Sequence, residues 1–272
     1  MITLAVLLTI HNRKDKTLEC LRALFKCDLP SNIVLDVIIT DDGSDDGSGD
    51  AVKKCFPQVS VLKGDGTLFW NRGMLNSWVS ALKIGYDLFL WLNDDTILQP
   101  YAINALVQGH IRHHKAIIIG ASADPLNESV ITYGGRRKAR NYPMVTPSLT
   151  KDVLCDTFNG NIVLVPQFVV NEIGILDSYF RHSFGDIEYG LRASKYGVRS
   201  VLVPGIVGFC SRDVVVPVFR QKGRSLISRY KLLYSPLGYN PFEEYYLNRK
   251  YFSFFKSIWW FLKIHMNVLF VK

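Results

Sequence analysis

Two adjacent carboxylates end an apolar run near the middle of the chain. Residues Leu88–Leu92 are large and hydrophobic over a short stretch, which is typical of a strand buried on both faces, and Asn93, Asp94 and Asp95 follow directly. In open α/β sheets, ligands bind at the carboxyl ends of strands. Neighbouring carboxylates repel unless a positive group lies between them, and Mg²⁺ or Mn²⁺ is commonly held by such acids together with substrate phosphates. Either acid could instead cap a helix that begins at Thr96.

A second acidic loop, Asp41-Asp-Gly-Ser-Asp-Asp-Gly47, follows the apolar run 35–40. Taken alone, this composition is ordinary turn chemistry. An Asp at the end of a strand in the first βαβ unit can instead accept hydrogen bonds from a nucleoside, as the ribose-binding acid of dinucleotide folds does. No Gly-x-Gly-x-x-Gly opens the first predicted helix, which disfavours a dinucleotide. A mononucleotide whose diphosphate lies on a metal ion fits the two loops better.

The elements that must position these loops alternate between strand and helix, which is the pattern of a parallel sheet. Hydrophobic periodicity predicts strands over 4–10, 35–40, 59–62 and 88–92, and helices over 16–25, 51–55, 75–84 and 96–107. Further helices are predicted over 169–173 and from Ile187, with Ile187, Leu191 and Tyr196 facing inward. The polar loops 9–13, 41–44 and 93–95 are then expected at one edge of the sheet.

Length and composition limit the class of protein. A chain of 272 residues suits one large α/β domain with an appendage, or two small domains, and 48% hydrophobic residues supply an ample core. The five cysteines are scattered and lack paired metal-ligand spacing, which argues against a disulfide framework or a zinc site and favours a reducing compartment. The first apolar run has no basic segment ahead of it, so it is expected to be a strand and not a signal peptide.

The net charge of +8 is concentrated near the C-terminus. Residues 1–212 contain 22 Lys and Arg against 21 Asp and Glu, whereas residues 213–272 contain 10 against 3. A nucleic-acid binder could have such a tail, but no recognisable nucleic-acid motif accompanies it, and no nucleic acid is expected as a partner.

The last 24 residues predict an amphipathic helix, after a stretch, 213–248, that lacks clear periodicity and contains three prolines. From Arg249 to Lys272, a polar stripe faces an aromatic-rich surface, which fits a helix lying in a membrane interface. Lys256 and Lys263 interrupt the apolar run and argue against a spanning helix. The alternative is a helix packed on the preceding domain or on a partner in a homodimer; the basic charge favours an anionic cytoplasmic leaflet.

Six motifs in order connect this chain to a known family. They are Leu8-Thr-Ile-His-Asn-Arg13, Ile39-Thr-Asp-Asp-Gly-Ser44, Gly64-Asp-Gly-Thr-Leu-Phe-Trp70, Leu90-Trp-Leu-Asn-Asp-Asp-Thr96, Asn159-Gly-Asn161 and Gly185-Asp-Ile-Glu-Tyr-Gly-Leu-Arg192. The series, over about residues 1–210, resembles glycosyltransferase family 2. The third motif is similar to that of bacterial members that build surface polysaccharide, among them rhamnosyl- and galactofuranosyl-transferase-like proteins.

The resemblance implies a fold and a reaction. The fold would be GT-A, a single nucleotide-sugar-binding α/β domain around a mostly parallel twisted sheet, over residues 1–212, with a donor nucleotide half (1–100) and an acceptor half (101–212). Residues 213–272 would form a basic, helical, amphipathic C-terminal extension. The reaction would be inverting, metal-dependent transfer from a UDP- or dTDP-sugar to a glycan or lipid-linked acceptor in O-antigen or capsule synthesis, in the cytoplasm at the inner face of the cell membrane. The alternatives are a catalytically silent membrane scaffold and, less favoured for want of a Gly-rich basic phosphate loop near Thr9, a sugar-phosphate nucleotidyltransferase.

The resemblance also assigns site residues. Asp186 falls on the catalytic base, although local sequence alone favours a helix cap there, and Asp95 falls on the ligand of Mn²⁺ or Mg²⁺. Donor-binding positions are Thr9, His11, Asn12, Arg13, Asp41, Asp42, Gly66, Trp70 and Asp94. Acceptor-binding positions are Asn159, Gly160 and Glu188, the last with helix-start electrostatics as an alternative.

Three positions depart from the family pattern. Asn93 stands where the first Asp of Asp-x-Asp is frequent, Gly185 where many relatives have Glu before the base, and Cys210 where many have His. A thiol is a poor ligand for a hard ion, so a packed core cysteine is expected. The basic stretch 136–140 follows two glycines and is predicted to be a flexible solvated loop, with cover for a diphosphate or anionic lipid as the alternative.

Overall fold

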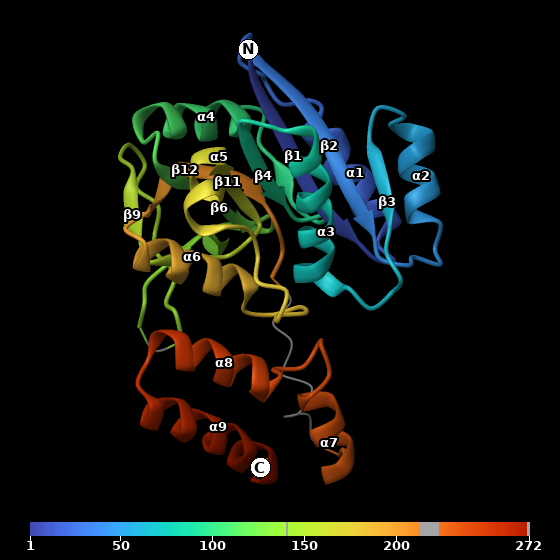
Figure 1. Ribbon diagram of the computed structural model, residues 1–272. Coiled ribbons are helices and arrows are strands. Elements are labelled where there is room, and N and C mark those ends of the chain that lie inside the picture. The colour runs from blue at the N-terminus through green and yellow to red at the C-terminus, as the bar shows by residue number, and fades with distance from the viewer. Residues whose placement is uncertain (140, 213–222, 271–272) are drawn as a thin grey trace.

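Four parallel strands carry the N-terminal half of the sheet. The computed structural model describes residues 1–139, 141–212 and 223–270 (Figure 1). Strands β1 (Ile2–Ile10), β2 (Ile33–Asp41), β3 (Ser60–Lys63) and β4 (Leu88–Leu92) are parallel neighbours in the order β3-β2-β1-β4. The predicted parallel α/β core is confirmed, and β4 has the predicted bounds.

The second half of the sheet mixes strand directions. Strand β11 (Ile162–Pro166) runs antiparallel between β4 and β6 (Ala116–Asp124), and β12 (Arg199–Phe209) is parallel to β6. At the edges, β5 (Ile97–Leu98) and β9 (Val153–Cys155) pair with β12, and β7 (Asn127–Tyr133) pairs with β6. A separate two-stranded sheet joins β8 (Gly135–Arg136) to β10 (Thr157–Phe158). The result is a mixed sheet in which parallel pairs predominate on the donor side.

Helices cover both faces of the sheet, which explains why its strands are hydrophobic throughout. Alternate residues of β1 enter two cores: Leu4 and Val6 belong to one, Ala5 and Leu7 to the other. The first core contains side chains of α1 (Lys14–Leu24), α2 (Ser48–Cys55) and α4 (Ala102–Arg112). The second contains side chains of α3 (Phe69–Ile84), α5 (Gln167–Ile173) and α6 (Gly185–Lys195).

The direction of strand order reverses at β1. From β1 the chain passes outward to β2 and β3, then returns through α3 to β4 on the opposite side of β1. In open α/β sheets such a switch point leaves a crevice outside the carboxyl ends of the two central strands. The loops after β1 and β4 therefore border the expected ligand crevice.

Two local predictions were wrong. Residues 96–101 are not helical, because Ile97 and Leu98 pair with β12 and Pro100 follows, so α4 begins only at Ala102. No helix starts beside Asp94 or Asp95, which removes the alternative that these acids are helix caps. Tyr196, predicted to face inward, is 63% exposed at the C-terminal cap of α6.

Three helices follow the sheet domain: α7 (Leu226–Leu233), α8 (Pro241–Tyr251) and α9 (Phe254–Leu269). The predicted helix from Arg249 is in fact broken, because Phe252 is extended and the Ser253 hydroxyl caps α9 by accepting from the Lys256 amide. The predicted loss of structure before residue 248 misses α7 and α8, the latter begun by Pro241 after the capping residue Asn240. Residues 140, 213–222 and 271–272, including the predicted domain boundary after 212, lie outside the described residues.

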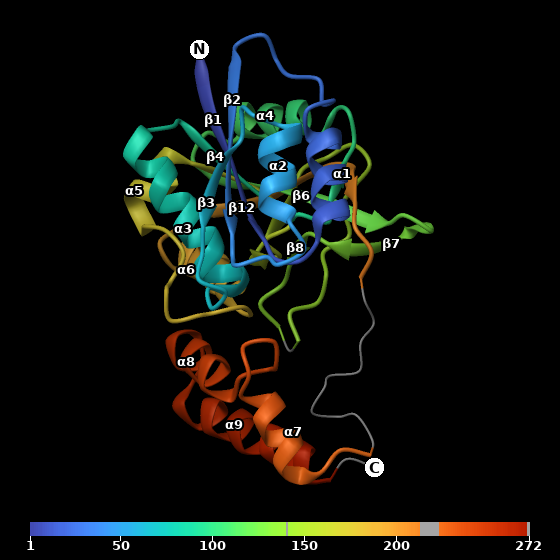
Figure 2. The same ribbon diagram turned by 90° about the vertical axis from the view of Figure 1, so that its right-hand side faces the viewer.

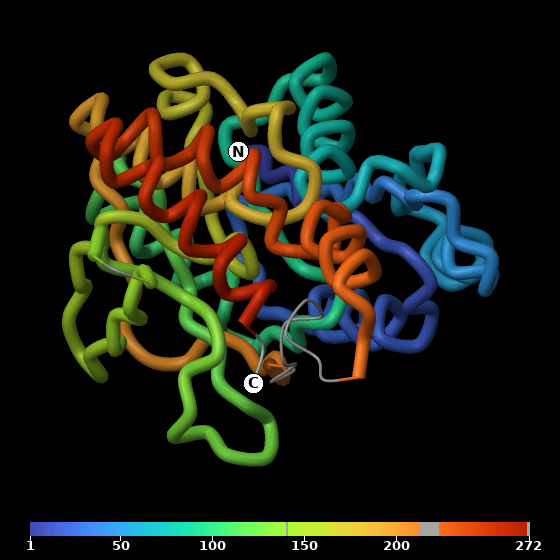
Figure 3. Tube along the Cα trace, turned by 90° about the horizontal axis from the view of Figure 1, so that it is seen from below, coloured from blue at the N-terminus to red at the C-terminus, as the bar shows by residue number. Residues whose placement is uncertain are grey.

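The C-terminal helices lie beside the functional edge of the sheet. In Figures 1 and 2, β1 and β2 run downward from the N-terminus, and α7, α8 and α9 lie below, on the side where those strands end. Figure 3, seen from below, places α8 and α9 in front of the sheet. A search of the described residues found no helix whose length and hydropathy suit a membrane crossing.

Candidate active site

The carboxylates after β4 meet a cation from the loop after β1. The Arg13 Nη1 lies 2.8 Å from an Asp95 oxygen and 3.4 Å from an Asp94 oxygen. The sequence predicts a positive group between these acids, and in the structure the guanidinium of Arg13 holds that place. The two loops approach because β1 and β4 are adjacent parallel strands with their carboxyl ends in register.

The two acids differ in exposure. Asp94 is 6% exposed, and this burial raises the pKa of its carboxyl to about 7 although Arg13 acts in the opposite direction. The Thr17 hydroxyl, 3.4 Å away, donates to its second oxygen. Asp95 has a 21% exposed side chain, so it is the acid that an incoming ion or phosphate can reach.

Cys210 closes the site at the end of β12. Its Sγ lies 3.5 Å from Asp95 Oδ1 and 3.8 Å from the Asn161 amide nitrogen. Burial, and next the Asp95 charge, raise the pKa of this thiol to about 12, so it is a protonated donor and not a thiolate ligand. Cys210 is buried, as predicted, but its contact with Asp95 could not be inferred from the sequence.

The carboxylate pair is compatible with a metal that arrives with substrate. Within residues 1–139, 141–212 and 223–270, no three His, Cys, Asp or Glu side chains converge as a ligand set. Asp94 and Asp95 supply hard oxygens, and Mg²⁺ is usually bound by one or two carboxylates plus phosphates. The donor chemistry therefore fits an ion whose shell is completed by a diphosphate, once Arg13 yields part of its contact with Asp95.

The loops after β1 and β2 are linked to each other. Asn12, at a φ of 51°, accepts from the Asp45 amide at 2.8 Å through its side chain and donates to the Ser44 hydroxyl at 3.0 Å through its backbone. His11 Nδ1 donates to the Asp42 carbonyl at 2.8 Å. Thr9, near the end of β1, lies against Gly73, whose missing side chain makes room for the threonine hydroxyl. The predicted donor residues of both loops therefore share one edge of the sheet.

Asp41 and Asp42 have different tasks. Asp41 is partly exposed and accepts from the Ser44 amide at 3.0 Å. Asp42 is 3% exposed, and its two oxygens accept from the Gly66 and Phe69 amides at 2.9 and 2.8 Å. We therefore reassign Asp42 from donor contact to positioning: it anchors the loop that carries Gly66 into α3.

Trp70 connects the donor loop to the second half of the site. It lies in the first turn of α3, and its Nε1 donates to Asn93 Oδ1 at 2.8 Å. A Cβ on Gly160 would lie 2.5 Å from the Trp70 ring, so only glycine permits this approach. Asn93, which stands where Asp is frequent in the family, supplies the side-chain oxygen that accepts this indole hydrogen bond.

Asp186 lies in the first turn of α6, where the prediction placed it. Its oxygens accept from the Gly160 amide at 3.0 Å and from the Ile187 amide at 2.7 Å. Burial raises the pKa of the carboxyl above the usual range, and these hydrogen bonds and Arg136 act in the opposite direction. A carboxylate with a raised pKa is a candidate proton acceptor.

Arg136 is a site residue that the sequence did not reveal. It lies on β8, mostly buried, and burial lowers its pKa while the Asp186 charge raises it. Its Nε donates to Asn159 Oδ1 at 2.6 Å and its Nη1 to the Tyr142 carbonyl at 2.5 Å. The predicted solvated loop is therefore wrong for Arg136; a two-residue strand has too short a pattern to be detected. Residue 140 of that stretch lies outside the described part.

The presence of glycine at position 185, where many relatives have Glu, has a steric reason. A Cβ at this position would lie 1.8 Å from the Asn71 side-chain oxygen. Asn71 is fully buried, and its Nδ2 donates at 2.9 Å to the carbonyls of Asp177 and Phe180. A glutamate before the base has no room in this chain.

Glu188 is not available to an acceptor. It is 0% exposed, one oxygen accepts from Lys250 and the Tyr251 hydroxyl at 2.7 Å each, and the other accepts from Arg192 at 2.9 Å. We therefore correct its assignment from acceptor binding to positioning, because it joins α6 to α8. Asn159 and Gly160 contact Arg136 and Asp186 as described, so they orient the Asp186 carboxyl; their contact with an acceptor stays a prediction.

The mixed sheet, the helices on both of its faces and the acidic loops at its edge have the architecture of the GT-A fold. The chain belongs to glycosyl transferase family 2, whose family model matches residues 5–162. The predicted family is thereby confirmed. A comparison with curated protein sequences found no match.

Solved structures share the fold. S. aureus TarS 1–349 superposes with a TM-score of 0.55 at 14% identity, covering 78% of this chain and 60% of that one. Its complex with UDP-GlcNAc gives 0.58 at 14%, covering 86% and 64%. The mannosyltransferase PcManGT from Pyrobaculum calidifontis, in complex with GDP-Man and Mn²⁺, gives 0.57 at 15%, covering 80% and 59%. The present chain spans less than two thirds of each of these structures.

Proposed function

We propose that this protein transfers a sugar from a nucleoside-diphosphate sugar to a hydroxyl of a glycan or lipid-linked acceptor in bacterial surface polysaccharide synthesis. The observation that carries the proposal is the link between two acidic centres through Trp70, whose indole donates to Asn93 and whose ring lies against Gly160. Asp94 and Asp95 with Arg13 form one centre, and Asp186 with Arg136 forms the other. Membership of family 2 supports sugar transfer over nucleotidyl transfer.

The donor would lie over the linked loops after β1, β2 and β4. In our proposal Asp41 would accept from the nucleoside, uridine of UDP or thymidine of dTDP, and Arg13 would face the diphosphate; their positions in the linked loops support this. A divalent ion, Mn²⁺ or Mg²⁺, held by Asp95 and by diphosphate oxygens would neutralise charge on the leaving group. Arg13 supplies part of the same compensation from the protein.

The reaction in this proposal is a single displacement with inversion. The acceptor oxygen forms a bond to the anomeric carbon while the bond from that carbon to the diphosphate oxygen breaks. Asp186 takes the proton from the acceptor hydroxyl, and the nucleoside diphosphate leaves with the bonding electron pair. The raised pKa of Asp186 makes it a stronger base than an ordinary carboxylate.

The first test is calorimetric titration of the purified protein with UDP, GDP and dTDP, with and without MnCl₂. We expect metal-enhanced binding of one nucleotide, lost or weakened at least tenfold in Asp95→Ala. Asp50→Asn, an exposed acid in the first turn of α2, is the matched control and keeps wild-type affinity. Failure of all three nucleotides to bind would reject the proposal and favour a silent scaffold that keeps the fold.

The surface of α9 supports a location at the inner face of the membrane. Phe255, Trp259, Leu262 and Met266 follow each other at helical spacing and are 82, 63, 54 and 52% exposed. The tail also carries most of the net positive charge. An apolar stripe with basic surroundings fits an interfacial helix on anionic lipid, which would place the site near a lipid-linked acceptor.

A further inference from the structure

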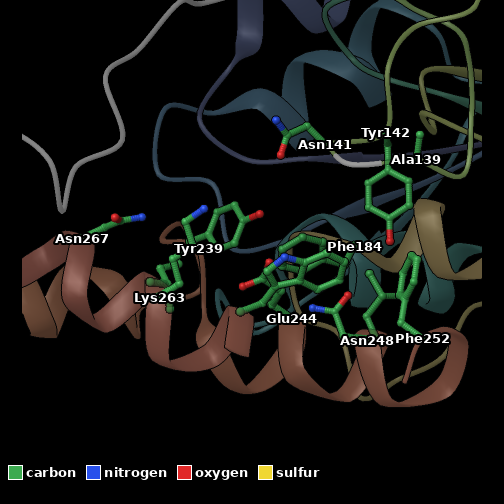
Figure 4. A pocket seen from close by; sticks show the side chains of 13 residues that line it. Ala139, Asn141, Tyr142, Phe184, Tyr239, Glu244, Asn248, Phe252, Lys263 and Asn267 are labelled. Atoms are coloured by element: carbon green, nitrogen blue, oxygen red, sulfur yellow. The ribbon is translucent and has the colours of Figure 1, made fainter. Parts of the chain in front are cut away.

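A cavity of about 470 Å³ lies between the sheet domain and the C-terminal helices. Its walls come from the segment around Tyr142, from Phe184, and from α8 and α9. Figure 4 shows Tyr142 pointing from the sheet domain toward the helices, which present Glu244 and Asn248 from the opposite side. The volume falls within the range of roughly 300–1,000 Å³ that is usual for small-molecule sites.

The cavity adjoins the proposed base. Phe184 is two residues before Asp186 and holds a left-handed backbone, with a φ of 70°, at the start of α6. The Tyr142 carbonyl accepts from Arg136, whose charge acts on Asp186. Two walls of the cavity are therefore continuous with the residues that orient the proposed base, so a ligand held here would lie next to the acceptor side of the site.

Two residues of the cavity wall have buried polar atoms without partners in the described chain. Asn248 is 3% exposed, and its Nδ2 has no partner among the described residues. The Tyr142 hydroxyl is likewise buried and unpaired within the described part of the chain. A buried donor left unsatisfied costs about 1–3 kcal/mol, so such atoms usually have a ligand or water to bind. Burial raises the pKa of the Tyr142 phenol, and the negative charge of Glu244 raises it further. The Glu244 carboxyl is therefore close enough to the phenol to act on it.

Aromatic rings make up much of the rest of the wall. The rings of Phe184 and Tyr239 meet edge to face at 5.3 Å, and those of Phe252 and Trp260 at 5.2 Å. Aromatic faces carry partial negative charge, which attracts the weakly positive C–H groups on one face of a sugar ring. The pKa of Glu244 is raised to about 7 by burial, so near neutrality this carboxyl both donates to and accepts from hydroxyl groups.

We propose that this cavity is a subsite for a neutral sugar residue of the acceptor, packed on the aromatic rings and hydrogen-bonded through Tyr142, Glu244 and Asn248. A sugar supplies both the hydroxyls and the apolar ring face that these walls require. An acyl chain would leave the amide and the phenol unpaired. This inference deepens the proposed transfer and depends on it.

The test uses the full chain with its donor pocket filled by the nucleoside diphosphate that binds most tightly. Methyl glycosides of galactose, glucose, rhamnose and N-acetylglucosamine are then titrated by NMR. We expect at least one to bind, and Tyr142→Phe and Glu244→Gln each to weaken it about threefold to tenfold. Tyr196→Phe, an exposed tyrosine at the end of α6, is the matched control and leaves the affinity unchanged.

Stability separates a ligand role from a structural one. The Tyr142 hydroxyl has no partner in the described chain, so its removal is expected to leave the melting temperature unchanged or raise it. The subsite would be overturned if no glycoside binds. It would also be overturned if the wild type and all variants bind a glycoside equally, because the glycoside would then be an adventitious additive only. Nucleotide binding in the same samples reports independently on the proposed function, so failure of one is distinguishable from failure of the other.

Discussion

At the scale of single residues, Asp186 is the side chain on which the chemistry of the proposed reaction depends. We expect Asp186→Asn to lower kcat by roughly 10²- to 10⁴-fold, because the variant cannot take the acceptor proton. Affinity for the donor nucleotide should be retained, since Arg13 and Asp95 belong to the other centre. In the wild type, kcat should fall on acidification, because the base must be ionised to take the proton. The raised pKa of Asp186 predicts that this fall occurs at a higher pH than for an ordinary carboxylate. Steady-state release of nucleoside diphosphate against pH checks both, and an unchanged rate in Asp186→Asn would reject the assignment.

Asp94 should make stability depend on pH. Its pKa is about 7 in the folded protein against an ordinary value of 3.8, so between these values the folded state binds more protons than the unfolded chain. The free energy of unfolding therefore falls as pH rises through this window, and the stabilising effect is complete only in acid. Asp94→Asn should remove this dependence and stabilise the protein more at pH 8 than at pH 5, by roughly 2–4 kcal/mol.

Urea denaturation at the two pH values measures the Asp94 effect. Glu244 has a similarly raised pKa and titrates in both proteins, so the difference between wild type and variant isolates Asp94. The exposed control Asp50→Asn should shift stability little at either pH. If Asp94→Asn changed the free energy of unfolding equally at pH 5 and pH 8, the raised pKa of the buried Asp94 carboxyl would be contradicted.

Residue type and spacing predicted Asp94 and Asp95, because both directly follow a short buried strand. Asp186 was assigned only by resemblance to the family, since its local sequence favoured a helix cap. The partners of these acids were harder to predict. Arg136 and Cys210 come from distant segments, and no local pattern places a guanidinium beside Asp186 or a thiol 3.5 Å from Asp95. Such contacts depend on strand pairing across the sheet, which a single sequence does not encode locally.

At the scale of elements, an ion pair between Lys250 and the buried Glu188 docks α8 onto α6 and thereby fixes the helix whose first turn contains Asp186. We expect Lys250→Met to lower the free energy of unfolding by about 3 kcal/mol, because it leaves Glu188, which is 0% exposed, short of one cation. The double variant Glu188→Gln/Lys250→Met should recover much of the loss. Chemical denaturation of the wild type, Glu188→Gln, Lys250→Met and the double variant gives the coupling energy.

A surface pair provides the control for that cycle. Arg112 and Asp152 are bridged at 2.7 Å, but the Arg112 side chain is 46% exposed, so Arg112→Met should change stability by less than about 1 kcal/mol. If Lys250→Met were equally mild, α8 would not be held through Glu188.

Element prediction succeeded where an apolar period was long and failed where pairing overrode it. Residues 96–101 carry helix-like spacing, yet the partner strand β12 draws Ile97 and Leu98 into the sheet. The start of α8 is set by a cap and a proline and not by hydrophobic periodicity, which explains why it was missed.

At the scale of the whole molecule, the C-terminal helices lie beside the edge of the sheet that carries the candidate site. They also form part of the cavity wall, and α9 carries the exposed apolar stripe. The strands β1 and β2 end toward α7, α8 and α9 (Figures 1 and 2). Val268 and Ile264 of α9 pack inward on Leu233 of α7, which leaves the opposite face of α9 with nothing from the described chain to cover its aromatic side chains. The orientation fits a protein that meets a membrane with its acceptor side.

Vesicle binding tests this orientation. We expect the protein to cosediment with vesicles containing phosphatidylglycerol, to bind neutral phosphatidylcholine vesicles much less, and to lose affinity as salt rises, because basic residues near an anionic surface contribute about 1 kcal/mol each. Trp259→Ser/Leu262→Ser should reduce binding at least tenfold by removing exposed apolar area. Leu126→Ser, 95% exposed in the turn between β6 and β7, is the matched control. If neither vesicle binds and Trp259→Ser/Leu262→Ser instead dissociates a dimer in sedimentation equilibrium, the stripe on α9 joins two copies of this chain, and the acceptor must reach the site from solution.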